Sequence, residues 1–310
     1  MDLSPLQKEI IALLREKSAI LLVHYYQRRE IQEIADFLGD SLALCMEAAK
    51  TDAKIIVFAG VHFMAESAAI LCPDKTVLIP RPDAGCPLAD TITPEQLKKA
   101  KEDHPEATVV TYINSTAEIK ALSDICCTSA NALDVIGSIR NAKEILMVPD
   151  GNLARYTARF TDSKIIPWEG TCPVHQALTP EEVRSRKTEH PDALFIAHPE
   201  CRPEVLLLAD FVGSTAAMLK LVHASDRNSF IVGTETGILV RMEKENPEKI
   251  LIPAAEHLIC ETMKYSTLED IHIAIKDMKH VVTLDERKRL CALSCLKKML
   301  ALSEASAQPR

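Results

Sequence analysis

The chain lacks the features that would direct it to nucleic acid, to a membrane or out of the cell. Its 36 basic residues are outnumbered by 44 acidic ones, and the resulting charge of −8 argues against a general nucleic-acid binder. Its longest apolar runs, such as residues 19–23, are far too short to span a bilayer. The first residues contain no basic segment followed by an apolar one, so we expect no secretory signal peptide and a cytoplasmic protein.

Linkers rich in glycine and serine are also missing from the 310 residues. An apolar content of 47% is enough to bury a large core, which predicts one to three domains, and without such linkers these should pack tightly. Ten cysteines without a secretory signal indicate a reducing compartment. There, metal binding or catalysis is a better default for cysteine than a disulfide.

What the sequence does contain is a repeat of about 87 residues, marked by a heptad that occurs three times. The copies "ADFLGDS", "SDICCTS" and "ADFVGST" begin at Ala35, Ser123 and Ala209. Each has an aspartate in second place and a hydroxyl residue in seventh place. A repeat of about 87 residues is longer than a solenoid unit, so each repeat unit is expected to be a small domain.

Each unit opens with the same helix-start signal. A hydroxyl residue is followed by proline, and by Gln or Glu three residues after the hydroxyl, which predicts a capping box at residues 4–7, 93–96 and 179–182. Three apolar strands follow in each unit, with helical stretches between them, and the third ends in Ile-Pro. Strands that alternate with helices predict βαβ units with parallel strands.

We therefore expect an α/β protein made of three homologous three-layer α/β/α domains, whose small parallel sheets pack around a pseudo-threefold axis. The predicted domains are residues 1–92, 93–178 and 179–268, followed by a helical tail at 269–310. In this tail we expect one amphipathic helix over residues 284–303, capped by Thr283 and Glu286.

One cysteine occupies an equivalent place in each unit, on the loop after the third strand: Cys86, Cys172 and Cys260. Each follows the end of the first strand of its unit by 60 or 62 residues. Around a threefold axis, three thiolates would converge. Structural zinc normally takes four protein ligands, whereas a [4Fe–4S] cluster held by three cysteines keeps one iron open. The matched offsets favour a metal site over three small buried cysteines in equivalent packing positions.

The other seven cysteines do not share this pattern. We expect packing or loop roles for five of them, and face-filling rather than chelation or pairing for the two on the last helix. The five are Cys45, Cys72, Cys126, Cys127 and Cys201, and the two are Cys291 and Cys295.

Polar side chains end the first strand of each unit, and a second polar side chain with the same facing follows two residues later. Ligands of open α/β sheets bind beyond the carboxyl ends of the strands, so this repetition favours one shared site over separate structural histidines. The strand ends are His24, Tyr112 and His198, and the residues that follow are Tyr26, Asn114 and Glu200.

The hydroxyl residues that close the heptads are Ser41, Ser129 and the pair Ser214-Thr215. Each precedes a helix-compatible run, so we expect it to cap a helix. Helix N-termini also bind anions, and their threefold repetition beside the cysteines predicts a site for carboxylates or phosphate in addition to simple capping.

Taken in order, the motifs resemble the quinolinate synthase family over about residues 20–270. Two positions depart from its usual pattern: Tyr25 stands where Asn is usual, and Glu261-Thr262 where Pro-Asn is commoner. The motifs are "HYYQ" (24–27), "GDS" (39–41), "GVHFMAESAAIL" (60–71), "AGCPLAD" (84–90), "TYINS" (111–115), "CTSANA" (127–132), "GTCPVH" (170–175), "HPEC" (198–201), "GST" (213–215), "GTETG" (233–237) and "CETMK" (260–264).

The resemblance implies three similar domains around one [4Fe–4S] cluster, bound by Cys86, Cys172 and Cys260 and open at its fourth iron. It implies an enzyme of de novo NAD biosynthesis that condenses iminoaspartate with dihydroxyacetone phosphate, with loss of phosphate and two waters, and that is supplied by an iminoaspartate-producing enzyme. The site positions that carry over are His24, Tyr26, Ser41, Tyr112, Asn114, Ser129, His198, Glu200, Ser214 and Thr215.

This chemistry suits the residues. An open iron is a Lewis acid that helps to expel a hydroxyl group, and Glu200, His198, Tyr26 and His24 are residue types that transfer protons. Two alternatives remain at this point: another iron–sulfur hydro-lyase acting on a hydroxy acid, and a non-catalytic iron–sulfur sensor. The sensor would need a basic or apolar docking surface in place of a convergent polar pocket.

Overall fold

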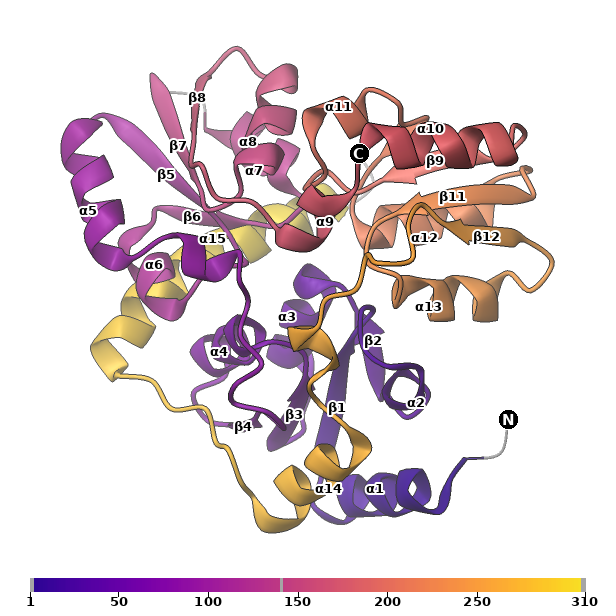
Figure 1. Ribbon diagram of the computed structural model, residues 1–310. Helices are drawn as coiled ribbons and strands as arrows, with labels where there is room; N and C mark the ends of the chain where they lie inside the picture. The colour runs from indigo at the N-terminus through magenta and orange to yellow at the C-terminus, as the bar shows by residue number, and fades with distance from the viewer. Residues whose placement is uncertain (1–2, 140–141, 308–310) are drawn as a thin grey trace.

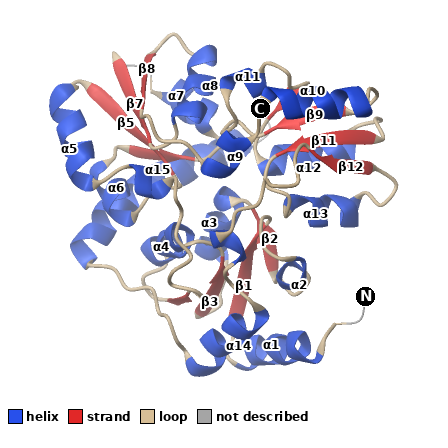
Figure 2. Ribbon diagram, in the orientation of Figure 1, coloured by secondary structure: helices blue, strands red, loops and turns tan. Residues whose placement is uncertain are grey.

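The computed structural model describes residues 3–139 and 142–307, which form three lobes, each built on a parallel four-stranded sheet (Figures 1 and 2). The strand order is the same in each sheet, with the first and third strands of the unit at its centre: β2-β1-β3-β4, β6-β5-β7-β8 and β10-β9-β11-β12. Helices flank the sheets, and the predicted α/β class with three small parallel sheets is confirmed.

The strands are short, as expected for small sheets, and the central ones are buried on both faces, as parallel strands normally are. Their bounds are β1 Ala19–His24, β2 Phe37–Gly39, β3 Ile55–Ala59, β4 Thr76–Leu78, β5 Ala107–Tyr112, β6 Ile125–Cys127, β7 Glu144–Val148, β8 Lys164–Pro167, β9 Leu194–Ala197, β10 Phe211–Val212, β11 Ser229–Gly233 and β12 Ile250–Pro253.

The α-helices alternate with these strands and continue into the tail. They are α1 Pro5–Glu16, α2 Arg29–Gln32, α3 Ser41–Lys50, α4 His62–Leu71, α5 Pro94–Asp103, α6 Ala117–Leu122, α7 Ala132–Ser138, α8 Gly151–Thr157, α9 Pro173–Ala177, α10 Pro180–Glu189, α11 Pro203–Leu206, α12 Thr215–Ala224, α13 Ile238–Glu245, α14 Leu268–Asp277 and α15 Glu286–Ala307.

The three predicted capping boxes are present at the starts of α1, α5 and α10. In each, the hydroxyl of the cap residue accepts a hydrogen bond from the backbone N–H three residues later, and the Gln or Glu at that place accepts one in return. Proline occupies the first turn, where its missing N–H is not needed. The repeated signal therefore begins three equivalent helices.

Each heptad holds an edge strand that was not expected, because the sequence indicated three strands per unit and the structure has four. Two or three residues are too few to show an alternating pattern. The aspartate in second place anchors this strand: its carboxylate accepts a hydrogen bond of 2.8 Å from a backbone N–H of the neighbouring central strand. The pairs are Asp36 with Leu21, Asp124 with Val109, and Asp210 with Phe195.

The predicted hydroxyl caps are wrong for two of the three heptads. Helix α3 is capped by Asp40, whose carboxylate accepts from the Ala43 N–H at 2.9 Å, and Ser41 is the first helical residue. Helix α7 begins only after Asn131, so Ser129 lies outside it. Ser214 does cap α12 as expected, by accepting from the backbone N–H three residues later at 3.2 Å.

The third strand of the first unit also ends earlier than predicted. Strands β8 and β12 include the proline of their Ile-Pro pair, but β4 ends at Leu78. The Ile79 N–H instead donates to the carbonyl of His280, at 3.1 Å, and Leu78 bridges to Val281. The chain therefore returns to the first sheet after it has completed the third.

The tail holds two helices where one was expected. Helix α14 packs against α1, and α15 runs along α6 and β6, so the tail touches the first two units (Figure 1). The predicted cap Thr283 is wrong: Asp285 accepts from the Lys288 N–H at 3.0 Å. No helix in the described ranges is long and apolar enough to cross a membrane. The domain boundaries remain a prediction.

Most of the cysteines outside the three matched positions are buried. Cys45, Cys72, Cys126, Cys127 and Cys201 lie in apolar packing, as expected. Cys295 fills the inner face of α15, where its sulfur lies 3.0 Å from that of Cys126, but Cys291 is exposed. The two tail cysteines therefore do not form a common site.

Replacing Asp124 with alanine should lower the free energy of unfolding by about 1 kcal/mol, because the Val109 N–H loses its acceptor in a partly exposed position. Urea unfolding followed by circular dichroism measures the change. The exposed Asp226 provides the matched control, and its change to alanine should stay within about 0.5 kcal/mol of zero. Equal stability of the two variants would contradict the anchoring role of the heptad aspartate.

Candidate functional site

The carboxyl ends of the central strands in all three sheets meet at one cavity of about 690 Å³, mouth included. His24 and Tyr112 end β1 and β5, and His198 directly follows β9. These places lie beside the point where each unit crosses from one side of its sheet to the other, which is where open α/β sheets bind ligands. The cavity therefore lies where the repeat predicts a shared site.

All but one of the residues proposed from the sequence line this cavity. The exception is Ser214, whose hydroxyl caps α12, although its neighbour Thr215 does reach the cavity wall. Those lining it are His24, Tyr26, Ser41, Cys86, Tyr112, Asn114, Ser129, Cys172, His198, Glu200, Thr215 and Cys260.

The three equivalent cysteines lie on the wall of this cavity, one from each unit. Burial raises the pKa of Cys86 to about 12 and raises the pKa of Cys172 and Cys260 as well. Such thiols do not ionise alone near neutral pH, but a bound cation stabilises the thiolate. Three partly buried cysteines on one cavity wall are therefore a donor set that fits a metal cofactor.

Glu200 is an acidic residue of the cavity wall, and its side chain is buried. Its Oε2 atom lies 2.7 Å from Nδ1 of His175 and 3.5 Å from Nδ1 of His198. Burial raises the pKa of Glu200, but the two imidazoles outweigh it and hold the pKa at about 2. Glu200 is thus an ionised acceptor, and its Oε1 atom has no hydrogen-bond partner among the described residues.

His24, His198, Tyr26 and Tyr112 are neutral near pH 7. Burial lowers the pKa of His24 to about 3, helped by Lys264, and lowers that of His198 to about 3, helped by His175. The Nε2 atom of His198 faces the Ser129 hydroxyl at 3.1 Å. Burial also raises the pKa of Tyr26 and Tyr112 well above 10. The cavity therefore places phenol donors and the uncharged imidazoles of His24 and His198 around the Glu200 carboxylate.

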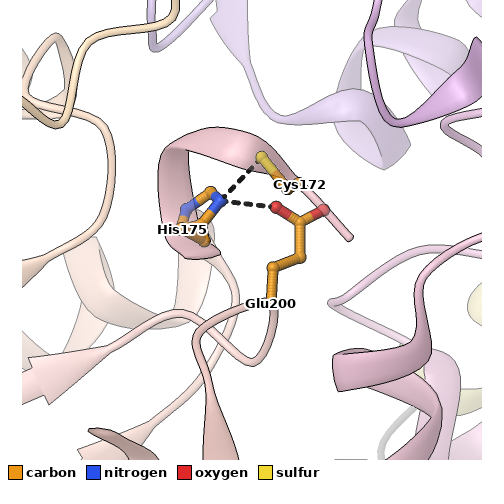
Figure 3. Close-up of side chains that lie close together, drawn as sticks. All are labelled: Cys172, His175 and Glu200. Carbon is orange, nitrogen blue, oxygen red and sulfur yellow. Dashed lines mark hydrogen bonds and ion pairs between the residues drawn. The ribbon is translucent and has the colours of Figure 1, made fainter. Parts of the chain in front are cut away.

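His175 is a cavity residue that the sequence did not single out. It lies in α9, three residues after Cys172. Its Nδ1 atom lies 3.2 Å from the Cys172 sulfur and also faces Glu200 (Figure 3). One sulfur, one nitrogen and one oxygen of these residues lie within 4.8 Å of one another, a spacing compatible with a metal ion. His175 has no counterpart in the other repeats, so the matched offsets could not find it.

Glu235 is a second cavity residue that the sequence did not single out. Its carboxylate accepts from the backbone N–H of Cys260 at 3.2 Å and pairs with Lys264 at 3.0 Å. The same ammonium group also donates to the backbone carbonyl of Tyr26. The ion pair of Glu235 and Lys264 thus connects a cysteine loop of the third unit to the first unit. In the sequence, Glu235 was marked only as part of the motif "GTETG".

Comparison with known proteins agrees with this geometry. A model of the quinolinate synthetase A protein family matches residues 8–301. The chain belongs to this family. It is 55% identical over 297 residues to a quinolinate synthase of Geotalea uraniireducens, and this alignment covers 96% of this chain and 97% of the relative. It is 51% identical over 302 residues to quinolinate synthase 1 of Methanosarcina acetivorans, which covers 97% and 99%.

The two departures from the usual quinolinate synthase pattern differ in their position. Tyr25 packs against apolar residues of the third unit and is not part of the cavity wall in the described residues. Thr262 does line the cavity, and its hydroxyl lies 3.6 Å from the Cys260 sulfur. Thr262 is therefore the departure that touches the cysteine loop.

The fold should lose stability as the pH falls from 6.5 to 3. Histidines of the unfolded chain bind protons near pH 6.5, whereas His24 and His198 of the folded protein stay neutral down to about pH 3. The free energy of unfolding therefore rises with pH across this window. Between pH 6.5 and pH 4, each of these two histidines changes the free energy of unfolding by up to about 3 kcal/mol.

Urea unfolding at pH 4, 5, 6 and 7 measures this dependence. His24→Gln should flatten the rise with pH, and His223→Gln, which changes an exposed histidine, should leave it unchanged. The same slope in both variants would show that His24 is not the group that resists protonation.

Proposed function

We propose that this chain, a quinolinate synthase by family, condenses iminoaspartate with dihydroxyacetone phosphate in the central cavity. Phosphate and two waters leave as the pyridine ring of quinolinate closes, a step of de novo NAD biosynthesis. The observation that carries the proposal is the convergence of three cysteines, an ionised Glu200 and two neutral histidines on one cavity shared by the three units. Relatives named quinolinate synthase that match nearly the whole chain support it.

Cys86, Cys172 and Cys260 would hold one [4Fe–4S] cluster with an open iron. Thiolates are the usual ligands of such clusters, and the three partly buried cysteines line a single cavity. When bound, the cluster supplies a Lewis acid for the departure of a hydroxyl group. The nearby His175 and Glu200 already pair with each other at 2.7 Å, so this contact does not require a separate ion between them.

The substrates are anions, and the cavity offers donors for two carboxylates and a phosphate. Ser41 and Thr215 are the first residues of α3 and α12, where free backbone N–H groups and the helix dipole favour negative charge. Tyr112, Asn114 and Ser129 add neutral hydrogen-bonding groups on the wall. We assign these five residues to substrate binding.

Proton transfer needs an acceptor and a donor on the same cavity. Glu200 is ionised and suits a general base, and Tyr26 is protonated and suits a general acid. His24 and His198 are neutral, so each has one nitrogen that donates and one that accepts. We assign the proton transfers of the condensation to these four residues.

The polar lining also separates this proposal from the alternatives. A sensor would not need convergent acid and base groups, and another hydro-lyase is not supported by the family match over residues 8–301. The proposal includes a cytoplasmic enzyme, in keeping with ten cysteines that form no disulfide, and a separate enzyme that produces iminoaspartate.

Replacing Cys172 with serine should abolish quinolinate formation and most of the iron content of anaerobically purified protein, because the cluster loses one of its three thiolates. Iron and sulfide analysis together with a quinolinate assay measure both effects. The same change at Cys86 or Cys260 should give the same result.

Cys291→Ser is the matched control, because Cys291 is exposed and outside the cavity. It should keep iron and activity. A Cys172→Ser protein with four irons and normal turnover would overturn the three-cysteine site, and a wild-type protein that forms no quinolinate would overturn the proposed function.

Glu200→Gln should reduce turnover by about 10²–10⁴-fold while iron content stays normal, because the amide keeps the shape of the side chain but cannot act as a base. Steady-state kinetics of quinolinate formation test this. Glu204→Gln changes an exposed glutamate of α11 and should leave turnover unchanged. Normal turnover of the Glu200 variant would assign the base to another residue.

A further inference from the structure

Each of the three matched cysteines begins a short helical turn. The backbone carbonyl of the cysteine accepts a hydrogen bond from the N–H group four residues later. The turns lead into the 3₁₀ helix Ala89–Thr91, into α9 and into the 3₁₀ helix Thr262–Lys264. The bonded pairs are Cys86 with Asp90 at 3.2 Å, Cys172 with Gln176 at 2.8 Å, and Cys260 with Lys264 at 3.3 Å. The three loops therefore share one backbone arrangement and differ in their side chains.

The second residue after the cysteine is where the loops differ in chemistry. It is Leu88 in the first unit, Val174 in the second and Thr262 in the third. Proline directly follows the cysteine in the first two loops, whereas Glu261 follows it in the third. The third loop therefore carries a hydroxyl at a place where its two counterparts carry an apolar side chain.

This hydroxyl is directed to the cysteine of its own loop. The Thr262 oxygen lies 3.6 Å from the Cys260 sulfur, a hydrogen-bonding distance for an atom as large as sulfur. In a free thiol either group could donate. A thiolate has no proton, so a Cys260 that holds a metal can only accept, and Thr262 is then the donor.

The backbone of this loop is held without the help of Thr262. The Cys260 N–H donates to the Glu235 carboxylate at 3.2 Å, and the same carboxylate pairs with Lys264 at 3.0 Å. Met263 is buried and anchors the turn in the core. Removing the Thr262 hydroxyl should therefore change the contact to the sulfur and leave the loop in place.

We propose that Thr262 is a positioning residue for the cysteine ligand of the third unit: its hydroxyl donates a hydrogen bond to the Cys260 thiolate and so retains the cluster. The inference rests on the proposed function, because that function assigns Cys260 to a [4Fe–4S] cluster. A hydrogen bond to a charged acceptor fixes the direction of the thiolate and stabilises its charge, which should slow the loss of iron. It should also raise the reduction potential, because the reduced cluster carries more negative charge.

The repeat itself supplies the variant that tests this inference. Thr262→Val removes the hydroxyl with little change of shape and introduces the residue that the second loop carries as Val174, so the turn should still form. Thr262→Ser keeps the hydroxyl. Glu261→Gln is the matched control, because it changes an exposed side chain of the same turn.

The first measurement is the rate of iron loss from the reconstituted full-length protein to an excess of the ferrous chelator bipyridine, under anaerobic conditions. Removing a group that supports a metal ligand typically weakens metal binding by about 10–100-fold, so Thr262→Val should lose iron at least about 10-fold faster than the wild type. Thr262→Ser and Glu261→Gln should both stay close to the wild-type rate.

The reduction potential of the cluster supplies a second readout, which a purely structural role of Thr262 would not move. A redox titration followed by electron paramagnetic resonance of the reduced cluster measures it. Thr262→Val should lower the potential, and Thr262→Ser should restore it. Should Thr262→Val fail to fold, Thr262→Ala removes the same hydroxyl in its place.

Three results would overturn the inference while leaving the proposed function intact: wild-type iron loss and potential in Thr262→Val, equal changes in Thr262→Val and Thr262→Ser, or iron loss from Glu261→Gln as fast as from Thr262→Val. A wild-type protein that binds no iron and forms no quinolinate would instead remove the proposed function, and this inference with it.

Discussion

The parallel arrangement of the strands is the constraint on which the rest of the structure depends. Because the four strands of each sheet run in the same direction, the loops that follow them all leave at one edge. Three such edges face a common cavity, which brings together His24, Tyr112 and His198 from segments far apart in the chain. The direction and order of the strands thus determine where the cavity lies.

Burial then determines the charges inside that cavity. Removing water disfavours ionised groups, so the cysteines and tyrosines keep their protons and His24 and His198 stay neutral. Glu200 is ionised because two imidazoles surround it. A cavity with neutral donors, the Glu200 carboxylate and three sulfurs is suited to a cationic cofactor and to anionic substrates held by hydrogen bonds.

The cavity also depends on contacts between units. Ser129 of the second unit meets His198 of the third, Tyr26 of the first meets Thr234 of the third, and Lys264 connects Glu235 to the backbone of the first. The tail adds α14 on the first unit and α15 on the second. Acid, base and cysteines therefore reach their positions only when all three units are packed.

The sequence alone determined the features that depend on neighbouring residues or on the repeat. Capping boxes, parallel strands and the equivalent cysteines could be predicted because each is encoded within a few positions and occurs three times. Edge strands of two or three residues could not be predicted, because so few residues show no alternating pattern. The caps Asp40 and Asn131 were missed because hydroxyl residues that can also cap a helix lie beside them in the sequence. Only the tertiary structure identified His175, since it has no counterpart in the other repeats. Its contacts with Glu200 and with Thr234, which is 59 residues away, arise from packing rather than from local backbone preference.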